Sequence, residues 1–312
     1  MTTLLYTHPS SLAHDTGPGH PEQQARAKAI YGAIEREEQK GNLANVIPRE
    51  APEATLAQLE RVHDARFIEA ILSAVPDDGY VRIDADTVMS PASGEAALCQ
   101  AGAVTAAVDA VIGGEADNAL CALRPPGHHA EPDRAMGFCL FNGVAVGAMQ
   151  AIAEHGLGKV SIFDFDVHHG NGTQAAFERN PQVQYLSTHQ WPLFPGTGAK
   201  EETGVGNIVN RPLPSGTGSR VWREVVEGDI LSAMDEFAPD LVMISAGFDA
   251  HRADPLASME LEEADFTWVT EALMALAKRH AKGRVVSVLE GGYDLPALTQ
   301  SFLAHLHALR AS

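Results

Sequence analysis

Cysteine is scarce in this chain of 312 residues: Cys99, Cys121 and Cys139 are the only three, and they lie far apart. They make no CxxC pair and no set of spacings typical of a disulfide framework, so we expect a reducing, cytoplasmic setting. We also expect no membrane-spanning segment, because we find no apolar run of sufficient length, and the first five residues lack the basic charge of a secretory signal. These absences argue against a secreted or membrane-bound protein.

Basic residues are also few. The chain has 22 Lys and Arg against 41 Asp and Glu, which gives a formal net charge of −19. Such a surface repels nucleic acid phosphates, so we expect no nucleic acid partner; it favours cationic substrates, although solubility alone explains much of the charge. Internal repeats, low-complexity tracts and linkers are missing as well. With 45% hydrophobic residues, the sequence predicts a single domain over residues 1–312.

Short apolar segments alternate with longer amphipathic or alanine-rich segments along the chain. The expected strands are 4–7, 118–122, 160–165, 183–188, 241–245 and 285–289, and the expected helices are 22–39, 62–72, 93–112, 143–155, 173–178, 221–237, 262–281 and 296–309. This alternation predicts an α/β fold with a central parallel sheet and helices on both of its faces. The stretches 76–91 and 190–218, which carry Gly and Pro, are expected to be irregular loops with a functional role.

The first candidate site follows the apolar segment 160–163. Asp164, Asp166 and His168 occupy alternate positions there, and on a strand such side chains project to the same side. Two carboxylates and an imidazole that converge on one point repel or desolvate each other unless a cation lies between them. A divalent metal fills that role, and mixed oxygen and nitrogen ligands suit zinc.

Polar residues also follow three other predicted strands. His128 and His129 come after 118–122, Asp249 after 241–245 and Tyr293 after 285–289. In a parallel sheet, ligands bind where the carboxyl ends of the strands meet, so we expect these side chains to surround one pocket. Asp249 on its own would be a weak signal, since acidic residues after strands often cap helices. The joint placement at four strand ends is what indicates a site.

The assembled residues predict metal-assisted hydrolysis of an amide or ester. Asp166, His168 and Asp249 make three protein ligands, which is the pattern of a catalytic metal with one position open for water. His128 and His129 are then candidates for the general base and acid. Tyr293, which follows two glycines, is a candidate donor to the developing oxyanion.

Seven motifs in this order closely resemble the zinc-dependent histone deacetylase superfamily, which includes acetylpolyamine amidohydrolases and acetoin-utilisation proteins. They are HDTGPGHPE from residue 14, RPPGHHA from 124, GFCLFN from 137, FDFDVHHGNGTQ from 163, FPGTG from 194, SAGFDAH from 245 and LEGGYDL from 289. The resemblance covers nearly the whole chain and is strongest to the class II branch. It implies the arginase–deacetylase fold, with the active site at the carboxyl ends of the strands.

The resemblance also implies roles for the site residues. Zinc would be held by Asp166, His168 and Asp249. His129 would be the general base and acid, with electrostatic support from His128. Asp164 would hold His128, and Asn171 would hold His129; partners of this kind fix the imidazole tautomer. Class I members have Asp where Asn171 stands, so we expect a lower pKa for His129 here.

Further residues match the family's substrate tunnel and a second cation site. Tyr293 matches the oxyanion tyrosine, and Gly137, Phe138 and Phe194 match the narrow tunnel that clasps an acyl-lysine stem. The expected structural potassium site comprises Asp164, Asp166, His168 and Ser187. Related two-manganese hydrolases carry a carboxylate at the position of Gly170, so its absence here argues for one catalytic metal.

These features predict a zinc-dependent deacylase that cleaves acetyl or related acyl groups from a lysine-like amine of a peptide or protein. One rival is an acetylpolyamine amidohydrolase, which narrows its channel with an inserted loop and acidic residues. The stretch 76–91 is short for that loop, and Leu256 stands at a rim position where a polyamine-selective relative carries Glu. The other rival is a non-catalytic binding protein, which a missing ligand or tyrosine would indicate. A chelator-controlled acetyl-lysine assay separates enzyme from binder.

Overall fold

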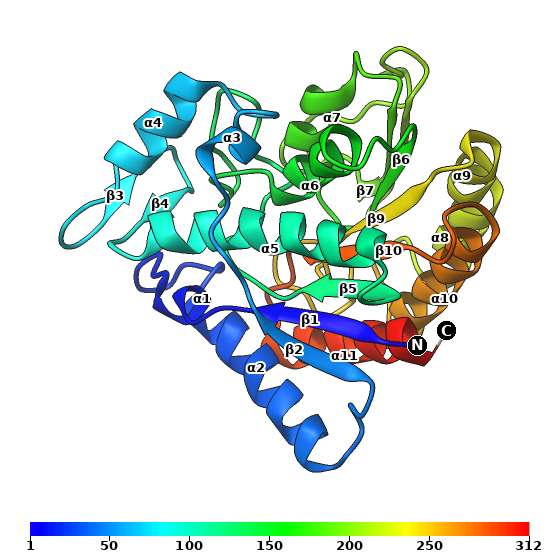
Figure 1. Cartoon of the computed structure of the whole chain (residues 1–312), viewed down its shortest axis with the longest axis horizontal. Helices are drawn as coiled ribbons and strands as arrows, with labels where there is room; N and C mark the ends of the chain where they lie inside the picture. The colour runs from blue at the N-terminus through cyan, green and yellow to red at the C-terminus, as the bar shows by residue number, and fades with distance from the viewer. Residues whose placement is uncertain (312) are drawn as a thin grey trace.

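An eight-stranded parallel sheet forms the centre of the computed structural model, which describes residues 1–311 (Figure 1). Its strands lie in the order β2-β1-β5-β10-β9-β6-β7-β8. Their bounds are β1 Thr3–Thr7, β2 Val46–Glu50, β5 Asn118–Cys121, β6 Val160–Asp164, β7 Val183–Gln190, β8 Ile208–Leu213, β9 Leu241–Ala246 and β10 Val285–Leu289. Every neighbouring pair is parallel, so the predicted fold class is confirmed.

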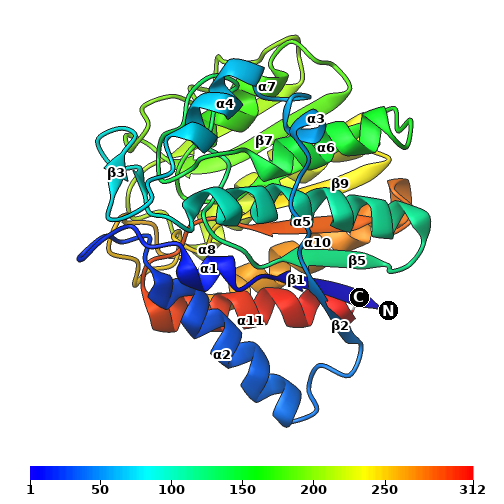
Figure 2. The ribbon, with the colours of Figure 1, turned by 60° about the vertical axis from the view of Figure 1, so that its left-hand side comes forward.

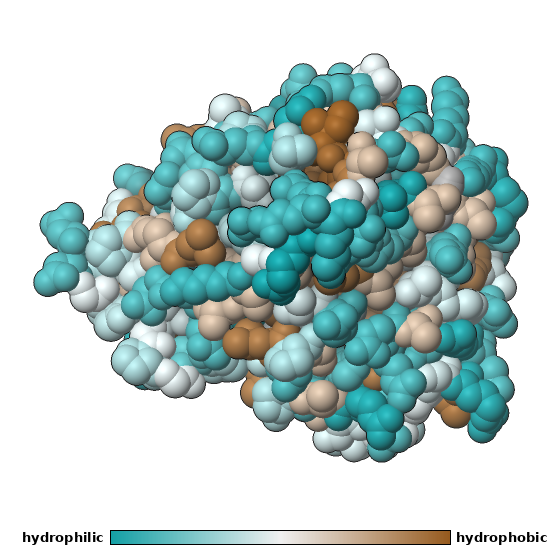
Figure 3. Space-filling model, turned by 90° about the horizontal axis from the view of Figure 1, so that it is seen from below, coloured by the Kyte–Doolittle hydropathy of each residue, from teal (hydrophilic) through white to brown (hydrophobic). Residues whose placement is uncertain are grey.

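Helices cover both faces of this sheet. Their bounds are α1 Ser10–Ala13, α2 Gln24–Gln39, α3 Leu56–Leu59, α4 Ala65–Ser73, α5 Ser93–Gly113, α6 Gly143–Ala153, α7 Asn171–Phe177, α8 Ser219–Val225, α9 Ser232–Phe237, α10 Glu263–His280 and α11 Leu295–Ala311. Helices α5 and α6 lie on one face, whereas α2, α10 and α11 lie on the other (Figures 1 and 2). On the face shown in Figure 3, hydrophobic residues form small separate patches among hydrophilic ones.

The central strands are apolar on both sides because each side packs against helices. Ile162 of β6 and Met243 of β9 belong to the core beneath α5 and α6. Their neighbours Phe163 and Ile244 belong to the opposite core, with α10 and α11. This alternation follows the two-residue period of a strand, and burial of both faces explains why these segments are continuous apolar runs.

Several elements differ from the prediction. The stretch 190–218, expected to be irregular, contains the edge strand β8, and the other edge strand, β2, was not predicted. The stretch 76–91 contains a short antiparallel pair, β3 (Val81–Arg82) and β4 (Val88–Met89). The predicted helix 221–237 is interrupted between α8 and α9 by one π-helical segment, Val226–Leu231. Edge strands are paired on one side only and can carry polar residues and proline, which hides them from an apolar-run search.

Helix α5 corrects the expectation that no apolar segment is long enough to cross a membrane. It has 21 residues and a mean hydropathy of 1.5 over its most apolar window, which suffices by length and composition. In the structure 72% of that window is buried against the rest of the chain. Small residues such as Gly102, whose added Cβ would overlap the backbone of Pro52, let it pack closely on its neighbours. It has the burial of a core helix.

A buried ion cluster joins the N-terminal segment to the carboxyl edge of the sheet. Glu22, Arg26 and Arg124 are all fully buried. The Glu22 carboxylate accepts from both guanidinium groups: at 3.0 Å from Arg26 and at 2.5 Å from Arg124 Nη2. Burial alone would raise the pKa of Glu22, but the charge of Arg124, the hydrogen bond from His14 and the charge of Arg26 outweigh it and hold the pKa well below its usual value. The carboxylate therefore stays ionised and is the shared counter-ion of the two buried guanidinium groups.

We predict that Glu22→Ala destabilises the fold by about 3–5 kcal/mol, because it leaves two guanidinium groups buried without a counter-ion. Urea unfolding gives the free energy, and Glu38→Ala, at an exposed position on α2, should change it by less than about 0.5 kcal/mol. Because the folded pKa of Glu22 is depressed, its stabilisation is complete above the unfolded pKa of about 4.3 and declines as the pH falls below it. Equal effects of the two variants would contradict the assignment.

Candidate active site

Three buried side chains converge at the carboxyl edge of the sheet: Asp166, His168 and Asp249, whose ligand atoms all lie within 4.8 Å of one another. His168 Nδ1 is 3.1 Å from Asp166 Oδ1 and 3.2 Å from Asp249 Oδ2. One expectation was wrong: β6 ends at Asp164, so Asp166 and His168 lie in the following loop and not on a strand. Asp164 turns away to His128, and Asp249 completes the group instead.

Glycines make room for these carboxylates. The Gly291 amide donates to Asp166 Oδ2 at 2.8 Å, and an added Cβ at Gly247 or Gly291 would overlap the Asp166 carboxylate group. At Gly170 a Cβ would overlap Asp164 and lie 2.7 Å from the Tyr185 hydroxyl. No side chain fits at position 170 without rearrangement, which agrees with the absence of a second carboxylate ligand there.

The donor set fits a single zinc ion. Two carboxylates and one imidazole are ligands that zinc accepts, and three protein ligands are the number found at catalytic zinc sites. Within residues 1–311, this is the one group of three His, Cys, Asp or Glu side chains with metal-ligand spacing. The same carboxylates are also held by amides: Val167 N donates to Asp249 Oδ1 and His168 N to Asp166 Oδ1, each at 2.9 Å. The site is therefore arranged by its backbone.

The two histidines after β5 have different partners. His128 Nδ1 pairs with Asp164 Oδ2 at 2.9 Å, and His129 Nδ1 with Asn171 Oδ1 at 2.8 Å. Burial opposes protonation of His128, but Asp164 and Asp166 outweigh it and raise its pKa well above the usual value. Burial, followed by the charges of His128 and His168, lowers the pKa of His129 well below it. These opposite shifts favour the cationic form of His128 and the neutral form of His129.

Asn171 also determines the tautomer of His129. Its Nδ2 donates to Glu131 Oε1 at 2.7 Å, which directs Oδ1 toward His129. A carbonyl oxygen only accepts, so His129 Nδ1 carries the hydrogen and Nε2 has a free lone pair. The neutral ring can therefore accept a proton on the side away from Asn171.

Two supporting residues were missed by the sequence analysis. Tyr185 of β7 donates its hydroxyl to Asp164 Oδ2 at 3.0 Å and accepts from Gly170 N at 2.9 Å. Glu290 accepts from the amides of Gly127 and His128 at 2.7 and 3.1 Å. Burial, with Asp164 and Asp166 acting in the same direction against His128, raises the pKa of Glu290 to about 7. Glu290 belongs to the LEGGYDL motif, so a signal existed; Tyr185 had none beyond its strand.

The Tyr293 loop is fixed by a third missed residue, Arg26. Its guanidinium donates to the carbonyls of Glu290 and Gly292, at 2.5 and 2.6 Å, and lies 5.0 Å from the Tyr293 ring centroid. Asp254 accepts from the Tyr293 amide at 2.7 Å. Burial raises the pKa of Tyr293 well above its usual value, although Arg26 opposes this, so the phenol remains a hydrogen-bond donor.

A cavity of about 230 Å³ leads to this centre. It is lined by Asp86, His129, Gly137, Phe138, His168, Leu193, Phe194, Leu256 and Tyr293. The structure thus brings together all four predicted tunnel residues with the catalytic candidates; Asp86 and Leu193 were not foreseen. Gly137 and Phe138 both have positive φ, 57° and 69°, and an added Cβ at Gly137 would overlap the His129 ring. The ring centroids of Phe194 and His129 are 5.1 Å apart. Phe194 is also 41% exposed, which places it at the rim of the cavity.

Ser187, predicted as part of a potassium site, lies on β7 beside Asp164 of β6 in the strand register. Its hydroxyl pairs with His189 Nδ1 at 2.9 Å. Asp164 Oδ1 accepts from the Asp166 amide at 3.2 Å. These residues are neighbours, and potassium binding by them stays a prediction.

The fold and the site together define the arginase–deacetylase class of protein. The sequence profile of the histone deacetylase domain matches residues 20–309. The chain therefore belongs to the histone deacetylase family, which confirms the resemblance drawn from its motifs.

Relatives and solved structures agree with this placement. The histone deacetylase-like amidohydrolase of Pseudomonas aeruginosa is 41% identical over 279 residues, covering 88% of this chain and 72% of that protein. The probable deacetylase of Archaeoglobus fulgidus is 36% identical over 299 residues, covering 95% and 82%. The crystal structure of the HDA15 HD domain superposes with a TM-score of 0.91 at 34% identity, covering 100% and 88%. The chain is accordingly a deacetylase or amidohydrolase of this family.

We predict that Asp166→Ala and Asp249→Ala each lower zinc content and activity together, since either change leaves a two-ligand site. Metal content of the purified variants, measured by mass spectrometry, is the direct readout. Asp133→Ala, which removes one exposed carboxylate, is the charge-matched control and should keep its zinc. Stoichiometric zinc in both site variants, with full activity, would refute the ligand assignment.

Proposed function

We propose that this protein is a zinc-dependent deacylase that hydrolyses the amide of acetyl-lysine or a related acyl-lysine. The observation that carries the proposal is the cavity itself. Its inner end carries His129, His168 and Tyr293, and its walls are formed by Phe138, Phe194 and other apolar residues. A narrow apolar passage suits the aliphatic stem of an acylated lysine, which has lost its charge, and brings its amide to the polar end.

Each polar residue has a role in amide hydrolysis. Zinc held by Asp166, His168 and Asp249 would supply the Lewis acid that makes water nucleophilic near neutral pH. Neutral His129 takes a proton from the attacking water through Nε2 and returns it to the leaving amine. Cationic His128 stabilises the negative charge that builds up beside it. The Tyr293 hydroxyl donates to the carbonyl oxygen as that oxygen becomes negative.

Leu256 and the surface charge bear on the class of substrate. Leu256 lines the cavity and is half-buried, so the mouth presents an apolar side chain at this point. An acyl-lysine peptide needs no counter-charge there, whereas an acetylated polyamine carries further ammonium groups that would gain from one. The net charge of −19 favours cationic amines in general and keeps acetylpolyamines as the second candidate. All three cysteines are buried and unpaired, which supports the cytoplasmic setting that we propose.

A direct test compares acetyl-lysine peptides, longer acyl-lysine peptides and acetylated polyamines as substrates of the zinc-loaded protein. We expect the highest kcat/KM on an acyl-lysine peptide, loss of activity with a chelator and recovery with added zinc. Turnover of acetylated polyamines alone would transfer the assignment to the second candidate. Binding of acyl-lysine without any turnover would identify a non-catalytic binding protein.

Tyr293→Phe isolates the role of one hydroxyl, because it keeps the ring and removes only the donor. Loss of such a donor typically lowers kcat by about 10²–10³-fold, or roughly 2.7–4 kcal/mol. The bond strengthens in the transition state, so kcat should fall much more than substrate binding weakens. Zinc content and thermal stability should stay near wild type. A kcat within about threefold of wild type, with zinc bound, would show that Tyr293 only packs the loop.

Leu256→Glu tests the specificity argument. The new carboxylate would lie at the cavity mouth, where the distal ammonium of an acetylated polyamine can pair with it. A solvent-exposed pair contributes about 0.2–1 kcal/mol. We therefore expect the ratio of kcat/KM for acetylated polyamine over acetyl-lysine peptide to rise about 1.5- to 5-fold. Leu256→Gln, of similar size without the charge, is the control; an unchanged ratio in Leu256→Glu would remove Leu256 from the specificity determinants.

A further inference from the structure

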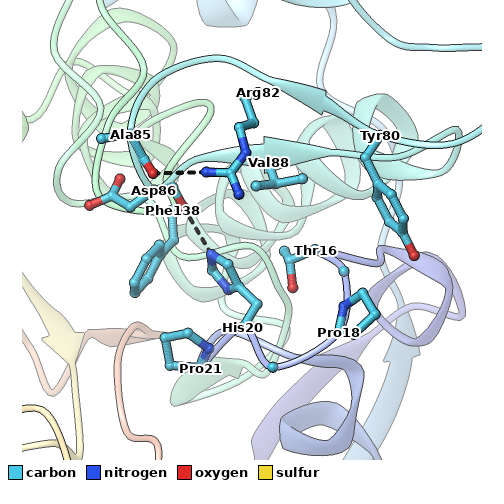
Figure 4. A pocket seen from close by; sticks show the side chains of 12 residues that line it. Thr16, Pro18, His20, Pro21, Tyr80, Arg82, Ala85, Asp86, Val88 and Phe138 are labelled. Atoms are coloured by element: carbon cyan, nitrogen blue, oxygen red, sulfur yellow. Dashed lines mark hydrogen bonds between the residues drawn. The ribbon is translucent and has the colours of Figure 1, made fainter.

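A second cavity, of about 650 Å³, lies beside the first and has no part in the reaction described above. Its walls are the loop 16–21 on one side and the β3–β4 hairpin with Phe138 on the other (Figure 4). Its lining residues include Pro18, Pro21, Arg82, Asp86, Val88 and Phe138. A volume of this size lies within the range of ligand-binding pockets and has room for more than one side chain.

Hydrogen bonds tie the two walls together. His20 Nε2 pairs with the Asp86 carbonyl at 2.9 Å, and His20 Nδ1 accepts from the Glu22 amide, so Nε2 carries the hydrogen and donates. The Tyr80 hydroxyl donates to Asp15 Oδ2 at 2.8 Å. These hydrogen bonds hold the loop and the hairpin together, so the shape of the cavity is set by the fold.

The two cavities share a wall. Asp86 and Phe138 line both of them, and the Phe138 ring packs against Tyr293 on one side and His20 on the other, with ring centroids 5.9 and 4.8 Å apart. A peptide whose acyl-lysine stem fills the first cavity can continue along this shared wall toward the second cavity. Because consecutive Cα atoms are about 3.8 Å apart, a residue one or two positions from the acyl-lysine can reach the second cavity.

Arg82 provides the charge that faces this space. In Figure 4 its guanidinium extends from the hairpin toward His20 and Thr16, whereas the Asp86 carboxylate points away from it. Within residues 1–311, its one hydrogen bond is to the Ala85 carbonyl at 3.3 Å, and no carboxylate lies at ion-pair distance from it. The nearby Asp84 is engaged, because its Oδ1 accepts from the amides of Asp86 and Thr87. The guanidinium thus has donors free for a ligand.

We propose that this second cavity binds an acidic side chain of the substrate, one or two residues from the acyl-lysine, through the Arg82 guanidinium. The proposal rests on the deacylase function proposed above and adds a sequence preference to it. Pro18, Pro21, Val88 and Phe138 add neutral walls. Asp86 also lines the cavity, but its carboxylate points away from the Arg82 guanidinium (Figure 4), so an incoming carboxylate meets that one cation. Planar guanidinium groups suit this ligand because they bind carboxylates with two parallel hydrogen bonds.

The overall charge of −19 acts against acidic peptides, but at a different range. Repulsion by the whole surface is screened beyond about 10 Å at 0.1 M salt, while a contact with Arg82 is local. The contribution of Arg82 is therefore measured by a ratio: the kcat/KM for an acidic peptide divided by the kcat/KM for a neutral one. Removal of Arg82 should lower this ratio. For a partly exposed ion pair of this kind, the expected change in that ratio is about 1.5- to 5-fold.

The test uses acetyl-lysine peptides that differ only in the flanking residue, Glu, Gln or Lys, placed on either side of the acetyl-lysine at one or two positions. The kcat/KM of each is measured for the zinc-loaded wild type, Arg82→Gln, Arg82→Glu and Arg66→Gln. Arg66 is exposed on α4 and outside the cavity, so its variant matches the change in net charge. We expect the Glu/Gln ratio to fall about 1.5- to 5-fold in Arg82→Gln at one position at least, and the Lys/Gln ratio to rise in Arg82→Glu. Arg66→Gln should leave both ratios at wild-type values.

The possible outcomes distinguish a failure of the Arg82 proposal from a failure of the proposed deacylase function. A Glu/Gln ratio that is the same in wild type and Arg82→Gln at every position overturns the role of Arg82, whatever the absolute activity. A ratio that falls equally in Arg66→Gln also overturns it and assigns the effect to net charge. If the wild type hydrolyses none of the peptides, the deacylase proposal fails instead. Fluorescence anisotropy binding of the same labelled peptides to wild type and Arg82→Gln then decides on Arg82.

Discussion

Burial of negative charge is the constraint on which the rest of the structure depends. Four carboxylates at the carboxyl edge of the sheet have no solvent exposure: Asp164, Asp166, Asp249 and Glu290. Buried ions are tolerated only where hydrogen bonds and opposite charges replace their hydration. Here the replacements are two imidazoles, His128 and His168, one tyrosine hydroxyl and a series of backbone amides. Neutralising the remaining charge is the reason that a metal ion suits this location.

The backbone donors explain the shape of the surrounding loops. The amides of Gly127 and Gly291 donate to the carboxylates of Glu290 and Asp166. At positions 170, 247 and 291 a side chain would overlap the buried carboxylates, so glycine leaves the space that they occupy. Arg26, on α2, donates hydrogen bonds to the carbonyls of Glu290 and Gly292. Its counter-ion is Glu22. The position of the Tyr293 ring is thus linked, through two side chains, to a buried ion cluster in the N-terminal segment.

Much of this could be predicted from the sequence because its signals are local. Strands β5, β6, β9 and β10 are apolar on both faces, and the polar motifs that follow them predict both the group Asp166, His168 and Asp249 and the histidine pair. The edge strands were not predicted. β8, for example, contains Asn210, Arg211 and Pro212, which interrupt the apolar pattern of a strand. The residues that contact Asp164 and Tyr293, which are Tyr185 and Arg26, were not predicted either. Tyr185 and Arg26 meet them only through folding, the latter across a separation of 264 residues from Glu290, and no local pattern marks such contacts.

The order of strands in the sheet has a consequence for how the site comes into being. β10, the last strand of the chain, lies between β5 and β9. It separates the half that carries the histidine pair, after β5, from the half that carries the metal ligands, after β6 and β9. Residues 285–289 are synthesised after both halves, and the pairing of β10 with β5 and β9 places the His128 side of the site next to the Asp164 side. A chain that ends before β10 would therefore keep six of the seven motifs but lack Tyr293 and the strand that joins the two halves of the site.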